Sequence, residues 1–281
     1  MESQSHVTAE MNFLDADGMS QKPTYYLCAP PAGIPQQNAK QTKRIIKIHD
    51  ARARIHDISL DREGISFTKH ETEVTNFYDA EEVRTVYYPE VASLVRKMTG
   101  AKHVHVFDHN VRCAPMSARG ENGAREPVKF AHNDYTLESA PRRVQELLPA
   151  AEAREKLKSR FAVINVWRPI RGPVQDTPLA VCDATSMSQA DFNETDLKYK
   201  DRTGEVYSVS YSAAHRWLYF PRMQKNEAML LKCYDSASDG RARFTAHSAF
   251  EDPTAQPDTP ARESIEARTL VFFPAQNREG L

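Results

Sequence analysis

The stretch "RFAVINVWRPI" (residues 160–170) is the clearest strand in the chain. Apolar residues run through it almost without a polar interruption, as they do in a strand that is buried on both faces. Similar runs follow at 178–187, 204–212, 216–221, 227–236, 244–250 and 263–273. Together with the alternating run "HVHVFDHNVR" upstream, they make about eight strands separated by turn residues. This pattern predicts a mostly β protein with flanking helices, built as a double-stranded β-helix (jelly-roll) barrel.

The chain before residue 100 predicts an extension of the barrel. Residues 1–22 are polar, and we expect them to form a flexible arm. Residues 23–281 would then form a single jelly-roll domain, whose first part, about 23–100, adds strands and a helix. The helix is expected over 79–100, with Pro89 kinking or splitting it.

The composition excludes several function classes. With 37 basic and 38 acidic residues the formal net charge is -1, which gives no reason to expect nucleic acid or an anionic membrane as a partner. The four cysteines are scattered singly, as in a reduced intracellular protein. No apolar run approaches the ~18 residues of a membrane span. We therefore expect a soluble cytoplasmic protein that binds neither nucleic acid nor membrane.

One short segment carries candidate chemistry. In "FAHNDYT" (130–136), His132 and Asp134 are two residues apart and would lie on the same face of a strand. A second histidine, His247, follows in "FTAHSAF". Two imidazoles and one carboxylate can occupy one face of an octahedral Fe(II) and leave three positions open. The pair alone is more typical of a surface hydrogen bond, so the prediction depends on the three residues together.

A closing strand adds a candidate anion site. In "RESIEARTLVFF" the side chains of Arg262, Ser264, Glu266 and Arg268 share one face. An arginine there can hold the far carboxylate of a 2-oxo diacid by a two-pronged, charge-assisted bond, and a neighbouring serine hydroxyl can donate to the same group. His215 is the rival for the third metal ligand. It is disfavoured because no such strand follows it at a suitable spacing.

The order of these motifs resembles a known family. The pattern is similar to that of the Fe(II)/2-oxoglutarate-dependent oxygenases, which use a double-stranded β-helix. It consists of H-x-D, a distant histidine, and R-x-S before an apolar strand. The segments "INVWRPI", "HRWLYFP", "LKCYDS", "HSAFEDP" and "RESIEAR" resemble, more narrowly, a tailoring group related to the cephalosporin 7α-methoxylase, with fungal hydroxylases, desaturases and a meroterpenoid endoperoxide-forming enzyme. The resemblance runs from about residue 75 to the C-terminus.

The resemblance implies a set of roles. His132, Asp134 and His247 would be the catalytic iron ligands, and Arg262 with Ser264 would bind 2-oxoglutarate. Further roles implied with less support are a contact of Asn165 with 2-oxoglutarate, Arg268 as the alternative anchor, and Tyr135, Trp167 and His215 as residues that contact the substrate.

The resemblance also implies a reaction. With O2 as cosubstrate, the enzyme would abstract a hydrogen atom from a small hydrophobic secondary metabolite of a terpenoid or meroterpenoid type. Hydroxylation, desaturation and endoperoxide formation all diverge after that step, and the sequence does not separate them. Two other classes stay open: a cupin-like metal enzyme without cosubstrate, and a metal-free jelly-roll binding protein. A homodimer is a further expectation.

Overall fold

Two sheets packed face to face make up the protein, whose computed structural model describes residues 5–274. The larger sheet has nine strands, in the spatial order β1 (His6–Asp15), β3 (Lys40–Asp50), β11 (Trp217–Tyr219), β8 (Leu179–Cys182), β13 (His247–Ala249), β6 (His132–Asn133), β10 (Thr203–Val209), β9 (Phe192–Lys198) and β2 (Thr24–Tyr26). The smaller sheet has five, in the order β4 (Ile65–Lys69), β12 (Glu227–Asp235), β7 (Phe161–Pro169), β14 (Ser264–Phe272) and β5 (His103–Arg112). This arrangement confirms the predicted jelly-roll fold.

Helical segments flank the sheets. They are α1 (Ala80–Glu82), the π-helical η2 (Val83–Tyr87), α2 (Tyr88–Thr99), α3 (Ala114–Ala118), α4 (Ser139–Leu147), α5 (Ala150–Lys156) and the short 3-10 turns η1 (Arg52–Arg54), η3 (Ala184–Ser186) and η4 (Gln189–Asp191). The helix expected over 79–100 begins after its N-cap residue Asp79 and ends at Gly100, which has a φ of 69°. Pro89 lies just after the π-helical segment, where a widened turn accommodates a residue without an amide hydrogen.

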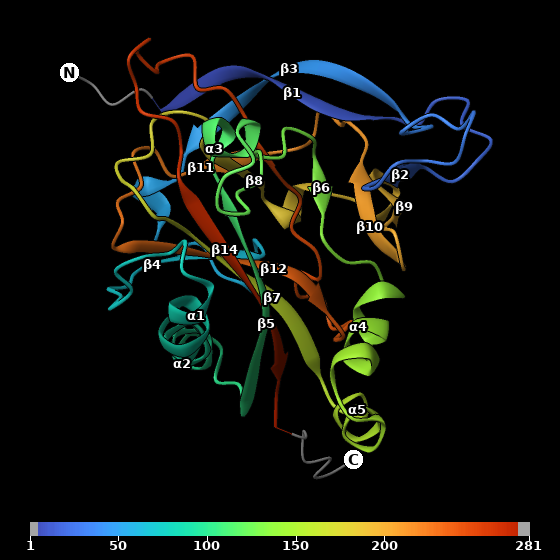
Figure 1. The fold of residues 1–281 in the computed structure, drawn as a ribbon, viewed down its shortest axis with the longest axis vertical. Coiled ribbons are helices and arrows are strands. Elements are labelled where there is room, and N and C mark those ends of the chain that lie inside the picture. The colour runs from blue at the N-terminus through green and yellow to red at the C-terminus, as the bar shows by residue number, and fades with distance from the viewer. Residues whose placement is uncertain (1–4, 275–281) are drawn as a thin grey trace.

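The central strand β7 is buried on both faces, as its apolar sequence predicts. Ala162, Ile164 and Val166 pack on the outer side of the small sheet, in one core with α2. Phe161, Val163 and Trp167 pack in the core that fills the space between the sheets. Figure 1 shows α1 and α2 beside the small sheet, and α4 and α5 following β6 at the lower end of the view. One position of the inner row, Asn165, is polar, and it belongs to the site.

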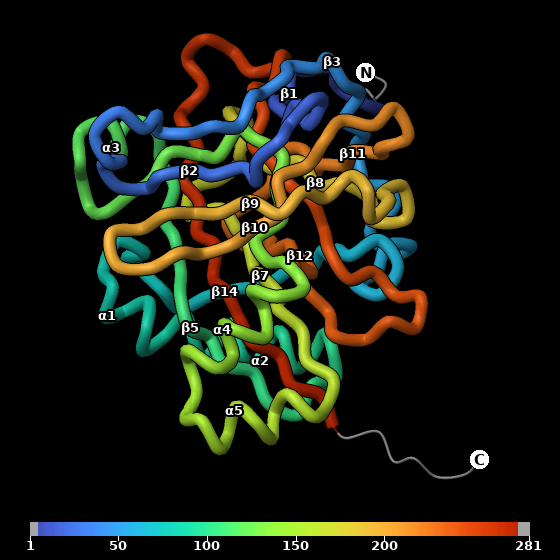
Figure 2. Tube along the Cα trace, turned by 90° about the vertical axis from the view of Figure 1, so that its right-hand side faces the viewer, coloured from blue at the N-terminus to red at the C-terminus, as the bar shows by residue number. Residues whose placement is uncertain are grey.

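The N-terminal residues correct one expectation. We expected a flexible arm over 1–22, but His6–Asp15 form strand β1, which pairs with β3 along its full length. Every second residue from Val7 to Phe13 is apolar and buried. This period of two is a strand signal that the charged and polar residues between these positions had obscured. Figure 2 shows the other edge of the large sheet, where β2 lies beside the hairpin of β9 and β10.

Candidate active site

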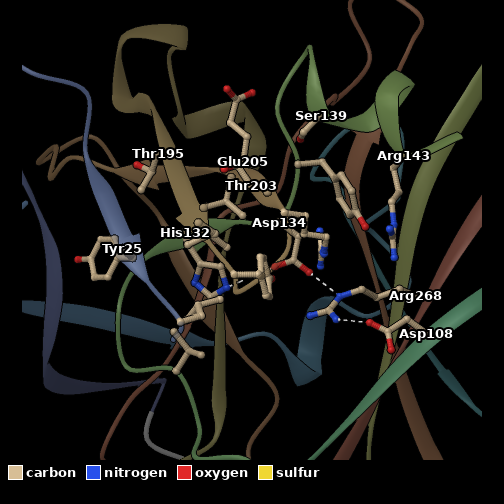
Figure 3. Close-up of a pocket in the computed structure, with 18 of the residues that line it drawn as sticks. Tyr25, Asp108, His132, Asp134, Ser139, Arg143, Thr195, Thr203, Glu205 and Arg268 are labelled. Carbon is tan, nitrogen blue, oxygen red and sulfur yellow. Dashed lines mark hydrogen bonds and ion pairs between the residues drawn. The ribbon is translucent and has the colours of Figure 1, made fainter. Parts of the chain in front are cut away.

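Three potential metal ligands converge between the two sheets. His132 lies on β6 and His247 on the neighbouring β13, directly opposite it in the register. Asp134 follows immediately after β6. Its Oδ1 lies 3.5 Å from His132 Nε2 and 4.0 Å from His247 Nε2, and one ligand atom from each of the three residues lies within 4.8 Å of the others. Figure 3 shows the imidazole of His132 beside this carboxylate, at the wall of a cavity.

Backbone carbonyls fix both imidazoles. His132 Nδ1 lies 2.7 Å from the carbonyl of Phe130, and His247 Nδ1 lies 3.1 Å from that of Thr245. A carbonyl oxygen only accepts, so each Nδ1 carries the hydrogen and each Nε2 keeps its lone pair toward Asp134. Anchoring the far nitrogen in this way is how proteins orient histidine ligands of a metal.

The small sheet holds the other oxygen of Asp134. Oδ2 accepts hydrogen bonds from Asn165 Nδ2 at 2.8 Å and from Arg268 Nε at 3.1 Å. Asn165 and Arg268 are register partners on β7 and β14. Oδ1 is thereby left to face the two histidines. We expected Asn165 to contact 2-oxoglutarate, but in this structure its Nδ2 donates to Asp134.

Electrostatics favour the protonation states that a cation requires at Asp134 and His247. Burial alone would raise the pKa of Asp134, but the charge of Arg268, and then the two histidines, hold it well below its usual range. Burial, followed by the charge of His132, lowers the pKa of His247. A carboxylate at Asp134 and a neutral imidazole at His247 result. Two nitrogen ligands and one oxygen ligand can occupy one face of an octahedral Fe(II) and leave the opposite face open.

Arg262 and Arg268 differ in their partners, which distinguishes the two candidate anchors. Arg268 lies within 3.1 to 3.2 Å of three carboxylates, those of Asp134, Asp108 and Glu266. Arg262 is 3% exposed, and none of the described residues places a carboxylate within ion-pair distance of it. Its Nη1 donates to the carbonyl of Thr177 at 2.7 Å, while its Nε has no partner among residues 5–274.

Burial lowers the pKa of Arg262 to about 9, because nothing nearby compensates its charge fully. The hydroxyl of Ser264 is also buried and, within the described part of the chain, unbonded. Trp167 Nε1, Asn165 Oδ1 and Asn110 Nδ2 share this condition. Buried polar groups without partners are rare, and several of those in the described residues lie together on the inner side of β5, β7 and β14. The hydroxyl of Ser264, Trp167 Nε1 and Asn110 Nδ2 are donors, which a doubly charged ligand such as 2-oxoglutarate would satisfy, whereas Asn165 Oδ1 only accepts.

Sequence reasoning missed Asn110. It lies opposite Glu266 in the register of β5 and β14, so its side chain faces the same space. The signal was available, because "HVHVFDHNVR" alternates and places Asn110 on the face of Asp108 and Arg112.

A cavity of about 430 Å³ opens next to the triad. His132, Asp134 and Arg268 form its inner wall, and Tyr135 lines it as expected for a substrate contact. Strands β9 and β10, helix α4, part of β5, the end of β2 and the segment before β6 supply the remaining walls. Trp167 does not line this cavity, and the expectation of a substrate contact is corrected: its ring packs in the core, 5.5 Å from the guanidinium carbon of Arg262.

His215 is also placed away from the cavity. Its ring packs against Phe13 and Trp217, with centroid distances of 6.5 and 6.4 Å. Its Nε2 lies 3.2 Å from a carboxylate oxygen of Asp191, without the alignment of a hydrogen bond. The expectation that His215 contacts the substrate is therefore corrected. His247, and not His215, lies beside His132 and Asp134 as the candidate third ligand.

A double-stranded β-helix with a His-Asp-His cluster, and with a buried arginine that lacks a counter-ion, defines the class of Fe(II)/2-oxoglutarate-dependent oxygenases. Comparison with known proteins agrees. A family profile described as "Oxidoreductase/YMDC permease-like domain" matches residues 11–272. The chain is 34% identical over 261 residues to hydroxylase/desaturase CTB9 of Cercospora beticola, covering 85% of this chain and 80% of that protein.

Two further comparisons point to the same group. The Fe(II)/2-oxoglutarate-dependent dioxygenase nvfI of Aspergillus novofumigatus is 32% identical over 277 residues, covering 96% of this chain and 98% of that one. The solved structure of the iron and alpha-ketoglutarate-dependent endoperoxidase NvfI superimposes with a TM-score of 0.86 at 30% identity, covering 96% and 99% of the two chains.

The chain belongs to this family of Fe(II)/2-oxoglutarate-dependent oxygenases. It is an enzyme that uses Fe(II) and 2-oxoglutarate and acts on a small molecule. The comparisons confirm the resemblance and do not favour a cupin-like enzyme without cosubstrate or a metal-free binding protein. Within residues 5–274, no helix is both long and apolar enough to cross a membrane.

Proposed function

We propose that His132, Asp134 and His247 bind the iron, and that Arg262 and Ser264 bind the distal carboxylate of 2-oxoglutarate. The enzyme then oxidises a small, mainly hydrophobic secondary metabolite, terpenoid or meroterpenoid in type, in the cavity beside the triad. The names of the relatives support the type of oxidation, since they include hydroxylase/desaturases and an endoperoxidase, and the terpenoid type follows from the resemblance in the sequence.

The observation that carries the proposal is the orientation of the three ligands. Both imidazoles turn Nε2 toward one carboxylate oxygen, and each far nitrogen is tied to a backbone carbonyl. A structural histidine pair beside an aspartate has no need of this shared direction. A three-ligand metal site requires it.

The chain's own residues have three tasks. Asn165 and Arg268 hold Oδ2 of Asp134, so that Oδ1 alone is offered to the metal. Arg262 and Ser264 orient the cosubstrate from a buried position, where water does not compete for their hydrogen bonds. Tyr135 and the strands around it give the substrate a shaped wall. When bound, Fe(II) with 2-oxoglutarate and O2 supplies the oxidant that removes a hydrogen atom from an unactivated carbon.

Hydroxylation, desaturation and endoperoxide formation remain three outcomes of this one step. The substrate radical takes a hydroxyl group, loses a second hydrogen atom, or combines with another O2. A cytoplasmic location, a homodimer and a single domain over 23–281 stay predictions.

The test measures whether a candidate substrate is oxidised together with the conversion of 2-oxoglutarate to succinate. The purified enzyme, supplied with Fe(II), 2-oxoglutarate and O2, is screened against terpenoid and polyketide-derived compounds by following succinate and the mass of each compound. We expect one class of compound to accelerate succinate formation and to gain one oxygen atom, lose two hydrogen atoms or gain two oxygen atoms. Acceleration by hydrophilic amino acids or nucleotides alone would overturn the proposed substrate class.

A further inference from the structure

The cavity beside the triad carries an excess of positive charge. Its walls include the side chains of six arginines and four carboxylates, which are Arg112, Arg125, Arg142, Arg143, Arg202, Arg268, Asp108, Asp134, Glu146 and Glu205. The proposed iron site accounts only for Asp134, a ligand, and for Arg268, which holds that carboxylate. The remaining charges face the space where the substrate of the proposed function would bind.

Every one of the four carboxylates already has a cation. Asp134 and Asp108 each lie 3.1 Å from Arg268. Glu146 lies 3.0 Å from Arg143, and Glu205 pairs with a lysine, Lys22, from outside the cavity. The pairing is therefore complete for the acidic groups.

Four arginines are left over. Among residues 5–274, no carboxylate lies within 4.0 Å of the guanidinium groups of Arg112, Arg125, Arg142 or Arg202. Arg202 stacks on the ring of Tyr199, with its guanidinium carbon 3.9 Å from the centroid. An aromatic face offsets a cation only in part.

Arg112 is the partly buried member of this group. It is the last residue of β5 and lies opposite Ser264 of β14. Its Nη1 donates to the carbonyl of Glu126 at 2.7 Å, which leaves the other guanidinium hydrogens without a carboxylate. Burial is the main cause that lowers the pKa of Arg112. An anion against this side chain would recover the solvation that burial removes.

2-Oxoglutarate does not account for this excess. In the proposed function one of its carboxylates would bind the iron and the other would bind Arg262, which is more deeply buried and does not line the cavity. The apolar part of the wall includes Leu27, Phe107, Val128, Phe130 and Leu197. The cavity thus combines apolar walls with a guanidinium group that lacks a counter-ion.

We propose that the substrate is an acidic amphiphile, with an apolar body in the cavity and an anionic oxygen group, such as a carboxylate, bound by Arg112. This rests on the proposed function, because it takes the cavity beside the triad as the substrate site. The proposal narrows the expected class of substrate from hydrophobic compounds in general to hydrophobic acids.

The test compares two probes of one skeleton. 8-Anilinonaphthalene-1-sulfonate carries an anionic group, and N-phenyl-1-naphthylamine is its neutral counterpart. Both are titrated without O2 into the enzyme loaded with Fe(II) and 2-oxoglutarate, and their fluorescence is followed. We expect the anionic probe to bind the wild type more tightly.

The variants locate the preference. Arg112→Gln should weaken binding of the anionic probe by about tenfold or more, as expected for a lost bond between charged groups, and should change the neutral probe by less than about twofold. Arg112→Lys should retain part of the preference. Arg96→Gln removes an exposed arginine of α2 outside the cavity and should change neither probe. Val128→Trp narrows the cavity and should weaken both probes.

Other results would overturn the proposal. Equal losses of both probes in Arg112→Gln would make its role structural, and an unchanged preference would place the anion elsewhere. A higher 2-oxoglutarate requirement in Arg112→Gln with an unchanged probe preference would assign Arg112 to the cosubstrate, with the oxygenase function intact. If the wild type forms no iron–2-oxoglutarate complex, the proposed function fails, and the probe preference is then read in the metal-free protein.

Discussion

Replacing Arg262 with methionine removes the proposed cosubstrate anchor while it keeps an unbranched, largely apolar side chain. The guanidinium group is buried and, among the described residues, donates only to the carbonyl of Thr177. A hydrogen bond to a charged group contributes roughly 1.5–3 kcal/mol, so the Kd for 2-oxoglutarate should rise by about 10- to 150-fold. Calorimetric titration of 2-oxoglutarate into the Fe(II)-loaded protein without O2 measures this directly.

The same variant has a second readout in thermal stability. At a 2-oxoglutarate concentration of about 100 Kd, the wild type should gain roughly 2.7 kcal/mol. At that same concentration the variant should gain only about 0.3 to 1.4 kcal/mol, since its Kd is higher. Arg96→Met, on the exposed side of α2, is the matched control and should behave as the wild type.

Arg268→Met separates the two arginines. Arg268 contacts Asp134, so its loss should weaken Fe(II) binding before it changes cosubstrate binding. If Arg262→Met leaves the Kd for 2-oxoglutarate unchanged and Arg268→Met raises it at saturating iron, the assignment of the anchor is refuted.

Three further predictions concern the triad. His247→Ala should abolish Fe(II) binding, whereas His215→Gln, which changes a side chain packed away from the cavity, should leave it intact; equilibrium dialysis decides between them, and the reverse result would reassign the ligand. Asn165→Leu should weaken Fe(II) binding by about 10- to 100-fold, because Oδ2 of Asp134 loses a donor; unchanged binding would show that this support is dispensable. Burial, and then the charge of His132, lower the pKa of His247 below 6.5, so the unfolded chain takes up a proton at a higher pH than the folded protein does. The metal-free protein should therefore lose stability as the pH falls below about 6.5. Urea titrations across this range should show a smaller loss in His247→Ala, and an equal loss would contradict the assignment.

The sequence predicted the three residues that the structure brings together, but it could not show which of the two arginines lies beside them. His132 and Asp134 belong to one short motif, and His247 precedes a strand of suitable pattern, so all three follow from local signals. Arg262 and Arg268 lie six residues apart and on one face of the chain, and either could reach an anion. Only the contact of Arg268 with Asp134, from a residue 134 positions away, distinguishes them.

The fold was predictable where strands were buried on both faces, as in β7. It was missed in β1, where a buried row alternates with polar residues at the edge of a sheet. The roles of Trp167 and His215 were misjudged for a related reason. The sequence pattern of a strand is the same whether an aromatic or histidine side chain faces a cavity or the core. The neighbouring strands determine which of the two it faces.

The most direct measurement is an anaerobic titration of the metal-free protein, first with Fe(II) and then with 2-oxoglutarate, followed by visible absorption. The account predicts a metal-to-ligand charge-transfer band that requires both additions, and that is absent in a His132→Ala variant. Iron binding by the wild type without any band on addition of 2-oxoglutarate would contradict the assigned cosubstrate site. A band of full strength in His132→Ala would contradict the assigned triad.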